Sequence, residues 1–366
     1  MIGCSIAWRL AQSGLKVSLF ERRRVGSEAS RAAAGMLSPQ GEAQAPGPFL
    51  DFGLRSRAMY RGFTDDLTEA SGIDVGYRDE GTLFVVVEGE DEKEKTRWAS
   101  WQLEAGLPLE HVSADDLRKL EPSVTNKATR AIFLSQEHQV DNRRLMDALE
   151  VAIKRVGVEV IEGAEVSALT TERGRVTGVA SGGTHWDAGT VILAAGSWSS
   201  SLLESVGLNI AITPARGQML AVRGSRAPIT RVLHSSSVYI VPRNDGRILI
   251  GATVEYAGFH KAVTAGAINQ LLTSAVELMP SLTTFEIIET WSGLRPDTSD
   301  HLPIIGTSGI DNLLLATGHF RNGILLAPLT ASLIAEFLNG NREPVELRYF
   351  SIDRLLLGDR SDPARV

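Results

Sequence analysis

The chain has little of what marks secreted, membrane-spanning or nucleic-acid-binding proteins. It has one cysteine in 366 residues, which excludes an internal disulfide framework and favours a reducing, cytoplasmic location. It contains no run of about 18 apolar residues and no basic-then-apolar leader, so neither a membrane span nor a secretory signal is expected. The net charge of −7 comes without a basic tract, which argues against nucleic acid as a partner. The seven histidines show no metal-ligand spacing, so no metal is predicted.

The remaining composition is that of an ordinary globular enzyme. Hydrophobic residues make up 43% of the chain and charged residues 22%. Its length suggests two domains, taking ~150 residues per domain. Helical spacing of apolar residues predicts helices over 52–72 and 265–278.

One further absence lies at the start of the chain, where only half of a nucleotide-binding motif is present. Residues 1–12 have a helical pattern, Gly14 ends that helix, and 16–20 form an apolar strand that closes on Glu21. This pattern is the second half of a βαβ dinucleotide-binding unit. Gly3 would be the last glycine of the G-x-G-x-x-G motif, followed by the helix and the second strand of the unit, and Glu21 would be the acidic residue that binds a ribose hydroxyl. The first strand and the first two glycines are absent. The alternative is a plain βα pair with a fortuitous glutamate.

A second motif is the apolar stretch 190–194, which runs into Ala195 and Gly196. Small residues at the end of a strand let the backbone pass close to a nucleotide. On its own the stretch is equally an ordinary buried strand. The carboxyl ends of neighbouring parallel strands meet at one edge of a sheet, where α/β proteins bind ligands. The two motifs together therefore favour a nucleotide site.

Arg295 is a candidate for binding a carboxylate. It lies in the apolar, turn-forming segment 292–306, and its planar guanidinium matches a carboxylate in shape and charge. The alternative is an ion pair with Asp297 or Asp300 inside a structural turn.

A second polar turn spans 316–328, where Gly318 and Gly323 flank a polar tip. Such a turn presents backbone N–H groups toward an anionic or electron-rich ring. For His319, a hydrogen-bonded structural role is favoured over that of a general base. Arg321 serves either a substrate carboxylate or the turn itself.

In combination, these motifs resemble the D-amino-acid oxidase superfamily of FAD-dependent amine oxidases, and within it the glycine oxidase branch. The matching segments run from end to end of the chain: 2–22, 27–37, 214–218, 238–243, 251–255, 292–306 and 317–330. The segment 318–328 is the most specific to that branch.

The resemblance implies a mixed α/β fold, in which a Rossmann-like FAD-binding domain is interleaved with an antiparallel-sheet substrate domain. The expected FAD-binding domain comprises 1–76, 139–212 and 291–350, the substrate domain 77–138 and 213–290, and the C-terminal tail 351–366. The superfamily carries an apolar strand and Gly-x-Gly before this helix, so about ten residues are expected to be missing ahead of Met1. A chain made as written is expected to hold FAD weakly.

The resemblance also implies the residues that would bind FAD without a covalent link. Glu21 and Arg22 would hold the adenosine ribose, and Val166 the adenine side. The pyrophosphate would lie along Ala29 and Ser30, and Gly3 would allow close packing of the helix on the strand. Ala195 and Gly196 would let the backbone pass close to the nucleotide. The flavin ring would be bordered by two groups of residues: Ala34, Gly35 and Met36; Gly318, His319, Phe320, Asn322, Gly323, Ile324 and Leu325.

The implied reaction is oxidative deamination of glycine or another small amine-bearing acid by O2, feeding thiamine biosynthesis. Arg295 and Arg321 would take the substrate carboxylate, with Tyr239 beside them, and no residue is a firm catalytic acid or base. The alternatives are a sarcosine or D-amino-acid oxidase or dehydrogenase of the same superfamily, and a catalytically silent binding protein. A homotetramer is the expected assembly.

Overall fold

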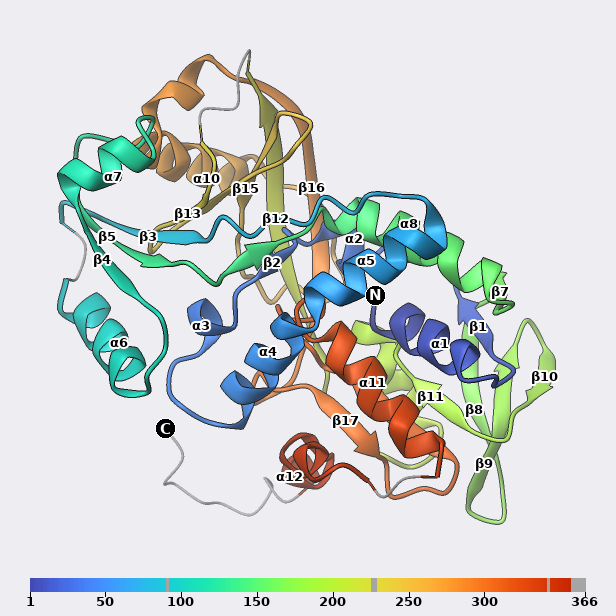
Figure 1. Cartoon of the computed structure of the whole chain (residues 1–366). Helices are drawn as coiled ribbons and strands as arrows, with labels where there is room; N and C mark the ends of the chain where they lie inside the picture. The colour runs from blue at the N-terminus through green and yellow to red at the C-terminus, as the bar shows by residue number, and fades with distance from the viewer. Residues whose placement is uncertain (90–91, 225–228, 341–342, 357–366) are drawn as a thin grey trace.

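An eight-stranded sheet is the largest element of the computed structural model, which describes residues 1–89, 92–224, 229–340 and 343–356. Its strand order is β16-β12-β15-β14-β13-β3-β5-β4 (Figure 1). These strands are β3 (Thr82–Val87), β4 (Glu110–Ser113), β5 (Ala128–Leu134), β12 (Thr213–Arg223), β13 (Val232–His234), β14 (Tyr239–Pro242), β15 (Arg247–Gly251) and β16 (Glu286–Asp297). All but one of its neighbouring pairs are antiparallel, the exception being β13 with β3.

The other half of the molecule is built from four small sheets with the strand orders β1-β7, β11-β18-β17, β10-β9-β8 and β2-β6. Their strands are β1 (Ser18–Glu21), β2 (Met36–Leu37), β6 (His138–Gln139), β7 (Glu159–Glu162), β8 (Val166–Glu172), β9 (Arg175–Ser181), β10 (Thr184–Asp187), β11 (Val191–Leu193), β17 (Ile304–Thr307) and β18 (Leu313–Thr317). The pairs β1 with β7 and β11 with β18 are parallel, as in an α/β nucleotide-binding fold. The mixed α/β fold class predicted from the sequence is confirmed. The predicted domain boundaries stay a prediction, and residues 357–366 of the predicted tail lie outside the described residues.

Helices cover the small sheets and pack on both faces of the large one. Those of seven or more residues are α1 (Ile2–Gln12), α4 (Pro48–Ala58), α5 (Tyr60–Ser71), α6 (Glu92–Glu104), α7 (Ala114–Leu120), α8 (Asn142–Arg155), α10 (Ala265–Leu278) and α11 (Ala327–Leu338). Shorter helices are α2 (Ala29–Ala32), α3 (Pro39–Glu42), α9 (Ser199–Glu204) and α12 (Asp353–Leu356), with 3-10 turns at Gly196–Trp198, Pro280–Thr284 and Val345–Phe350. The helix predicted over 265–278 is confirmed as α10. The single helix predicted over 52–72 is wrong, because the chain forms two helices that meet at Met59.

Local chemistry explains where α5 and α8 begin and end. Asp141 precedes α8, and its carboxylate accepts hydrogen bonds from the backbone N–H groups of Arg143 and Arg144. Gly72 follows α5 in the left-handed conformation, with φ of 75°, which only glycine adopts without strain. Within the described ranges, no helix combines the length and the apolar character needed to cross a membrane.

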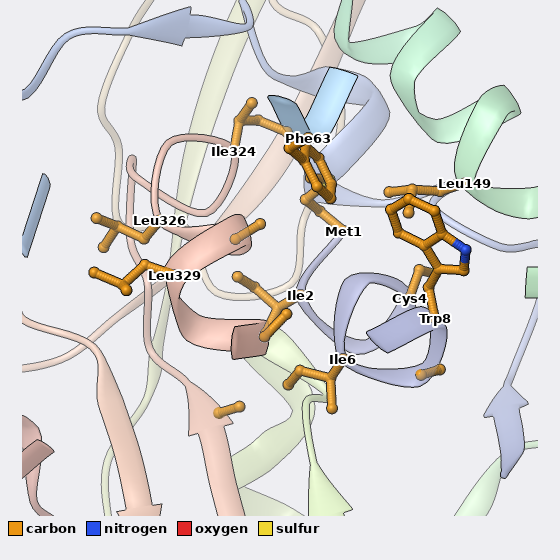
Figure 2. Close-up of a cluster of buried hydrophobic side chains, with 14 of the residues drawn as sticks. Met1, Ile2, Cys4, Ile6, Trp8, Phe63, Leu149, Ile324, Leu326 and Leu329 are labelled. Carbon is orange, nitrogen blue, oxygen red and sulfur yellow. The ribbon is translucent and has the colours of Figure 1, made fainter. Parts of the chain in front are cut away.

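The main hydrophobic core surrounds α1, which lies beside α11 (Figure 1). Figure 2 shows Met1, Cys4 and Trp8 of this region against Phe63 and Leu149. The Trp8 and Phe63 rings meet edge to face with centroids 5.8 Å apart. Burial raises the pKa of the Cys4 thiol, which is consistent with a packing role and not with a reactive one. The amino end of α1 is therefore held firmly in place by its apolar face.

Candidate active site

A single long cavity of about 1380 Å³ runs from α1 to the eight-stranded sheet. This exceeds the range of about 300–1,000 Å³ that is typical of a pocket for one small ligand. One part is lined by α1, β1 and β11, and we call it the nucleotide end. Another part is lined by Tyr239, Arg295 and Arg321, and we call it the substrate end. All the predicted site residues line this cavity except Gly318 and Leu325.

At the nucleotide end, β1 and β11 each face the cavity with one edge. Among the described residues, β1 pairs only with β7 and β11 only with β18. Leu19, Phe20 and Ile192 of these strands line the cavity although they are apolar. Gly3 of α1 packs so closely on this edge that an added Cβ atom would lie 3.4 Å from the Cβ of Ala194. The glycine thus brings the amino end of α1, with its free N–H groups, close to the strand ends.

Charged and aromatic groups surround the predicted ribose and pyrophosphate positions. Arg22 stacks over the Trp198 ring, 3.7 Å from its centroid, and its Nη2 lies 3.0 Å from a Glu28 carboxylate oxygen. The Glu21 carboxylate accepts a hydrogen bond of 2.9 Å from the backbone N–H of Arg23. The Met1 amino group donates to Ser30 Oγ at 2.9 Å. The remaining predicted residues that line this stretch of the cavity are Ala29, Val166, Ala195 and Gly196.

Residues 34–36 line the cavity between the two ends. Gly35 has a φ of +72°, and an added Cβ atom would lie 2.1 Å from the Val140 carbonyl oxygen, so no other residue fits there. The segment is fixed by the backbone N–H of Val140, which donates to the Gly35 carbonyl at 2.9 Å. Ala34 and Met36 therefore present small or flexible groups to the cavity on a fixed backbone.

The turn after β18 contributes five of its seven predicted residues to the cavity wall: His319, Phe320, Asn322, Gly323 and Ile324. Gly318 lies instead against Thr298, whose Cγ2 would be 2.7 Å from an added Cβ atom. Leu325 is buried in the core, and its carbonyl accepts a hydrogen bond of 2.7 Å from Ser56 Oγ. Gly318 and Leu325 thus lie outside the cavity wall, because the turn folds back into the protein at both ends, and their contact with the cofactor stays a prediction.

The His319 ring is buried and its Nε2 lies 3.4 Å from Thr330 Oγ1. Burial lowers the pKa of His319 to about 3, so the ring is neutral near pH 7. This arrangement agrees with a structural role for the histidine.

Arg295 lies in strand β16, and the turn predicted for this part of the chain begins only after Asp297. The strand pairing places it opposite Ala215, and its Nη1 donates to the Thr253 carbonyl at 2.9 Å. The predicted alternative, an ion pair with Asp297 or Asp300, is wrong. Asp297 accepts a hydrogen bond of 2.7 Å from the Tyr256 hydroxyl. Asp300 instead pairs with Arg354 at 2.6 Å.

Arg295 is thus a cation at the cavity wall that forms no ion pair, although the Tyr239 hydroxyl hydrogen-bonds to it and the Glu42 carboxylate attracts it from farther away. No carboxylate of the described residues forms an ion pair with it, and its desolvation by burial lowers the pKa of the guanidinium. A desolvated cation without a counter-ion costs free energy, which a bound anion offsets. The geometry makes Arg295 an anion-binding group.

Two glycines that the sequence analysis did not single out make room for the substrate end. An added Cβ atom on Gly217 would lie 2.3–2.4 Å from the Arg295 guanidinium atoms. On Gly251 it would lie 2.6 Å from the Tyr239 hydroxyl oxygen. Strand pairing explains both, because Tyr239 lies opposite Gly251 across β14 and β15, and Gly217 lies beside β16. Both close contacts follow from the register in which the strands pair, and the sequence of one strand alone does not determine that register.

Tyr239 and Arg321 complete this end. Burial raises the pKa of the Tyr239 hydroxyl, which lies 3.7 Å from the Met219 sulfur. The Arg321 guanidinium contacts the Glu42 carboxylate through Nη2 at 2.8 Å and Nε at 3.1 Å. Glu42, at the end of α3, is a further residue that the sequence analysis missed. With its charge already balanced, Arg321 is less available to a substrate carboxylate than Arg295.

The model of one protein family, FAD dependent oxidoreductase (DAO), matches residues 1–337. The chain belongs to the DAO family. A DAO-family relative from Bacillus licheniformis, named glycine oxidase, is 35% identical over 93% of this chain and 91% of its own length. A Synechocystis relative named bifunctional protein ThiO/ThiG is 36% identical over 97% of this chain, which spans about half (53%) of that longer protein.

Solved structures agree with this family assignment. The crystal structure of glycine oxidase from Geobacillus kaustophilus is 31% identical and superposes with a TM-score of 0.92, covering 96% of this chain and 95% of the other. The structure of iminodiacetate oxidase from Chelativorans sp. is 26% identical, with a TM-score of 0.85 and 96% coverage of both chains.

The residues present in this DAO-family chain fit FAD, the cofactor of the family. The cavity is lined by both α1 and the substrate end, and Gly35 lets the backbone of residues 34–36 pass along its wall, where an added Cβ atom would meet the Val140 carbonyl oxygen. The α1 amino end suits the pyrophosphate, and residues 34–36 suit a flat ring next to the substrate. No group of three or more His, Cys, Asp or Glu side chains in the described part of the chain could hold a metal ion.

Proposed function

We propose that this DAO-family protein is an amino acid oxidase that converts glycine, with O2 and water, to an oxo acid, ammonia and hydrogen peroxide. The observation that carries the proposal is Arg295, a desolvated cation without a counter-ion at the wall of the cavity, beside residues 34–36. The relatives named glycine oxidase, matched along nearly their whole length, support the choice of substrate.

In the proposed reaction, FAD supplies the redox chemistry by accepting a hydride from the substrate carbon and passing the electrons to O2. The protein contributes mainly position. Arg295 binds the substrate carboxylate, and its Nη1 bond to the Thr253 carbonyl fixes the direction of the guanidinium. Tyr239, whose hydroxyl stays protonated because burial raises its pKa, donates a hydrogen bond to the same carboxylate. Such fixed orientation is worth several kcal/mol of the barrier without a general base.

Arg321 is proposed to assist through its charge. Its ion pair with Glu42 holds the guanidinium at the wall of the substrate end, where it donates to a substrate carboxylate only as a secondary partner beside Arg295. His319 and the other turn residues border the cofactor.

We further propose that the product feeds thiamine biosynthesis in the cytoplasm, on the basis of the likeness to the ThiO/ThiG proteins. A homotetramer is proposed as the assembly. The apolar residues Ile287 and Ile288 are exposed on β16, which is an edge strand of the large sheet, and they offer a surface for self-association.

A substrate panel with peroxide detection tests the proposal. Purified protein supplied with FAD is offered glycine, sarcosine, D-alanine and D-proline at equal concentrations, and peroxide and ammonia are both measured. The proposal expects glycine to give both products at the highest kcat/KM. Preference for sarcosine or a D-amino acid would change the substrate. Reduction of an artificial acceptor without peroxide would make the protein a dehydrogenase, and no flavin binding at all would make it a silent protein.

A further inference from the structure

Arg243 is buried behind the segment that lines the middle of the cavity. Arg243 directly follows β14 in the chain, and the residue is 4% exposed. It does not reach the long cavity and borders a separate hollow of about 300 Å³ on the other side of the segment. Its Nη2 donates to the Ala34 carbonyl and, at 3.3 Å, to Asn142 Oδ1, while its Nη1 donates to Gln139 Oε1 at 2.9 Å. The nearby Asp141 pairs instead with Arg247, at 2.7 Å.

The contact with Ala34 fixes the direction of the next backbone N–H group. The peptide bond between Ala34 and Gly35 is trans, and in a trans peptide the carbonyl and the N–H point in opposite directions. Because the Ala34 carbonyl points to Arg243, the Gly35 N–H points away from it, toward the cavity that both residues line. The positive φ of Gly35 and the bond from Val140 hold the peptide in this orientation.

The part of a bound cofactor that would face this N–H is its reactive ring. Ala34 and Met36 belong to the same apolar cluster as Met219 and Tyr239, so the segment adjoins the substrate end. The nucleotide end, with α1 and Glu21, lies at the other part of the cavity. A cofactor that spans the two must place its ring, and not its phosphates, against residues 34–36.

We propose that Arg243 is a positioning residue that makes bound FAD easier to reduce. It turns the Gly35 N–H toward the flavin ring and places a buried positive charge behind it, and both favour the electron-rich reduced ring over the oxidised one. The proposal rests on the proposed function only in requiring FAD. It does not depend on which amino acid is oxidised.

The test compares the reduction of bound flavin in three variants without any substrate. Arg243→Met removes the charge and the donors, Arg243→Lys keeps the charge but cannot span three acceptors, and Arg247→Met removes a neighbouring arginine that has no contact with Ala34. The equilibrium constant for two-electron reduction is measured against a redox dye, and the FAD dissociation constant by flavin fluorescence. Arg243→Met is expected to lower the reduction constant at least tenfold, about 30 mV, and Arg243→Lys to recover most of it. Arg247→Met is expected to stay within twofold of the unmodified protein.

An Arg243→Met protein that binds FAD with a reduction constant within twofold of the unmodified value would overturn the proposal and leave Arg243 a purely structural residue. If Arg243→Met does not fold, Arg243→Gln, which removes the charge but keeps a donor, takes its place. A reduction constant more than twofold below the unmodified value then supports the proposal, and one within twofold of it contradicts the proposal. Failure of glycine oxidation with normal reduction constants would instead count against the proposed function alone.

Discussion

The two ends of the cavity are built on different principles. The nucleotide end combines backbone and small side chains, namely Gly3, Ala29 and Ala195, with the charged pair Glu21 and Arg22 around the amino end of a helix. The substrate end depends on one charged side chain that forms no ion pair, Arg295, held in a space that Gly217 leaves open. The first kind of site tolerates changes that keep the backbone near the ligand, whereas the second depends on a single group. The difference teaches that cofactor binding and substrate binding should be separable by mutation.

The largest effect is expected from Arg295→Met. A carboxylate that loses a buried charged partner loses about 3–5 kcal/mol, so kcat/KM for glycine should fall about 10²–10⁴-fold while FAD stays bound. Steady-state peroxide assays and the visible flavin spectrum check both halves of the statement. Arg295→Lys is the control, and it should recover only part of the loss because an ammonium cannot make a paired contact. Loss of flavin together with activity would break the comparison between the two ends.

The next largest effect is expected at Glu137, behind the substrate end, and it is an effect on the free energy of unfolding. It is buried, accepts a hydrogen bond of 2.9 Å from the Gln40 backbone N–H in α3, and its desolvation raises its pKa from 4.5 to about 7. Because the folded pKa is the higher one, the folded state retains a proton that the unfolded state has lost. The free energy of unfolding therefore falls as pH rises from about 4.5 to 7, by about 3 kcal/mol in total, and is flat above that range.

Urea unfolding at pH 5 and pH 8 measures this effect. From pH 5 to pH 8, the free energy of unfolding of Glu137→Gln should rise relative to that of the unmodified protein. The exposed Glu204→Gln should show the same difference from the unmodified protein at both. A gap between Glu137→Gln and the unmodified protein that does not change with pH would contradict the assignment.

Gly217→Ala tests the space around Arg295 without touching its charge. The new Cβ atom would lie 2.3–2.4 Å from the guanidinium and push it aside. We expect kcat/KM for glycine to fall about 30-fold, since about 2 kcal/mol is typical of overpacking at a tight site. Gly62→Ala, in α5 with no atom within 4 Å of the new Cβ, is the matched control and should keep full activity. Equal activity of the two variants would show that Arg295 has room to move.

The smallest effect is expected from Tyr239→Phe. One hydrogen bond to a charged group is removed while the ring and its packing stay, so kcat/KM should fall about tenfold, corresponding to about 1.5 kcal/mol, the lower end of the range for such a bond. The change should appear mainly in KM, which a glycine titration with peroxide detection measures. A loss as large as that of Arg295→Met would make Tyr239, and not Arg295, the main carboxylate ligand.

The nucleotide end was largely predictable from the sequence, and the substrate end was not. Gly3, the strand ending at Glu21 and the Ala195-Gly196 pair are local patterns, because backbone-lined sites need small residues at fixed spacing. The helix over 265–278 was also visible, since its apolar residues repeat with helical spacing.

The rest depends on contacts between distant segments. Arg295 was found, but its strand was taken for a turn, because the pairing of β16 with β12 depends on residues about 80 positions away. Gly217, Gly251 and Glu42 gain their roles only through their partners across the fold. Gly318 and Leu325 were included with their neighbours, although the turn directs them into the protein. Met59 separates two helices where the apolar pattern continues without a break.

The central claim is that Arg295 binds the substrate carboxylate independently of FAD binding. The most direct test is a titration of the flavin-loaded protein with glycolate, a small carboxylate without an amine. The account predicts a saturable shift of the visible flavin bands in the unmodified protein, because the ligand binds beside residues 34–36. In Arg295→Met the bands should keep their intensity but the glycolate dissociation constant should rise at least 100-fold. Equal glycolate affinity in the two proteins would contradict the account, since the carboxylate would then bind elsewhere in the cavity.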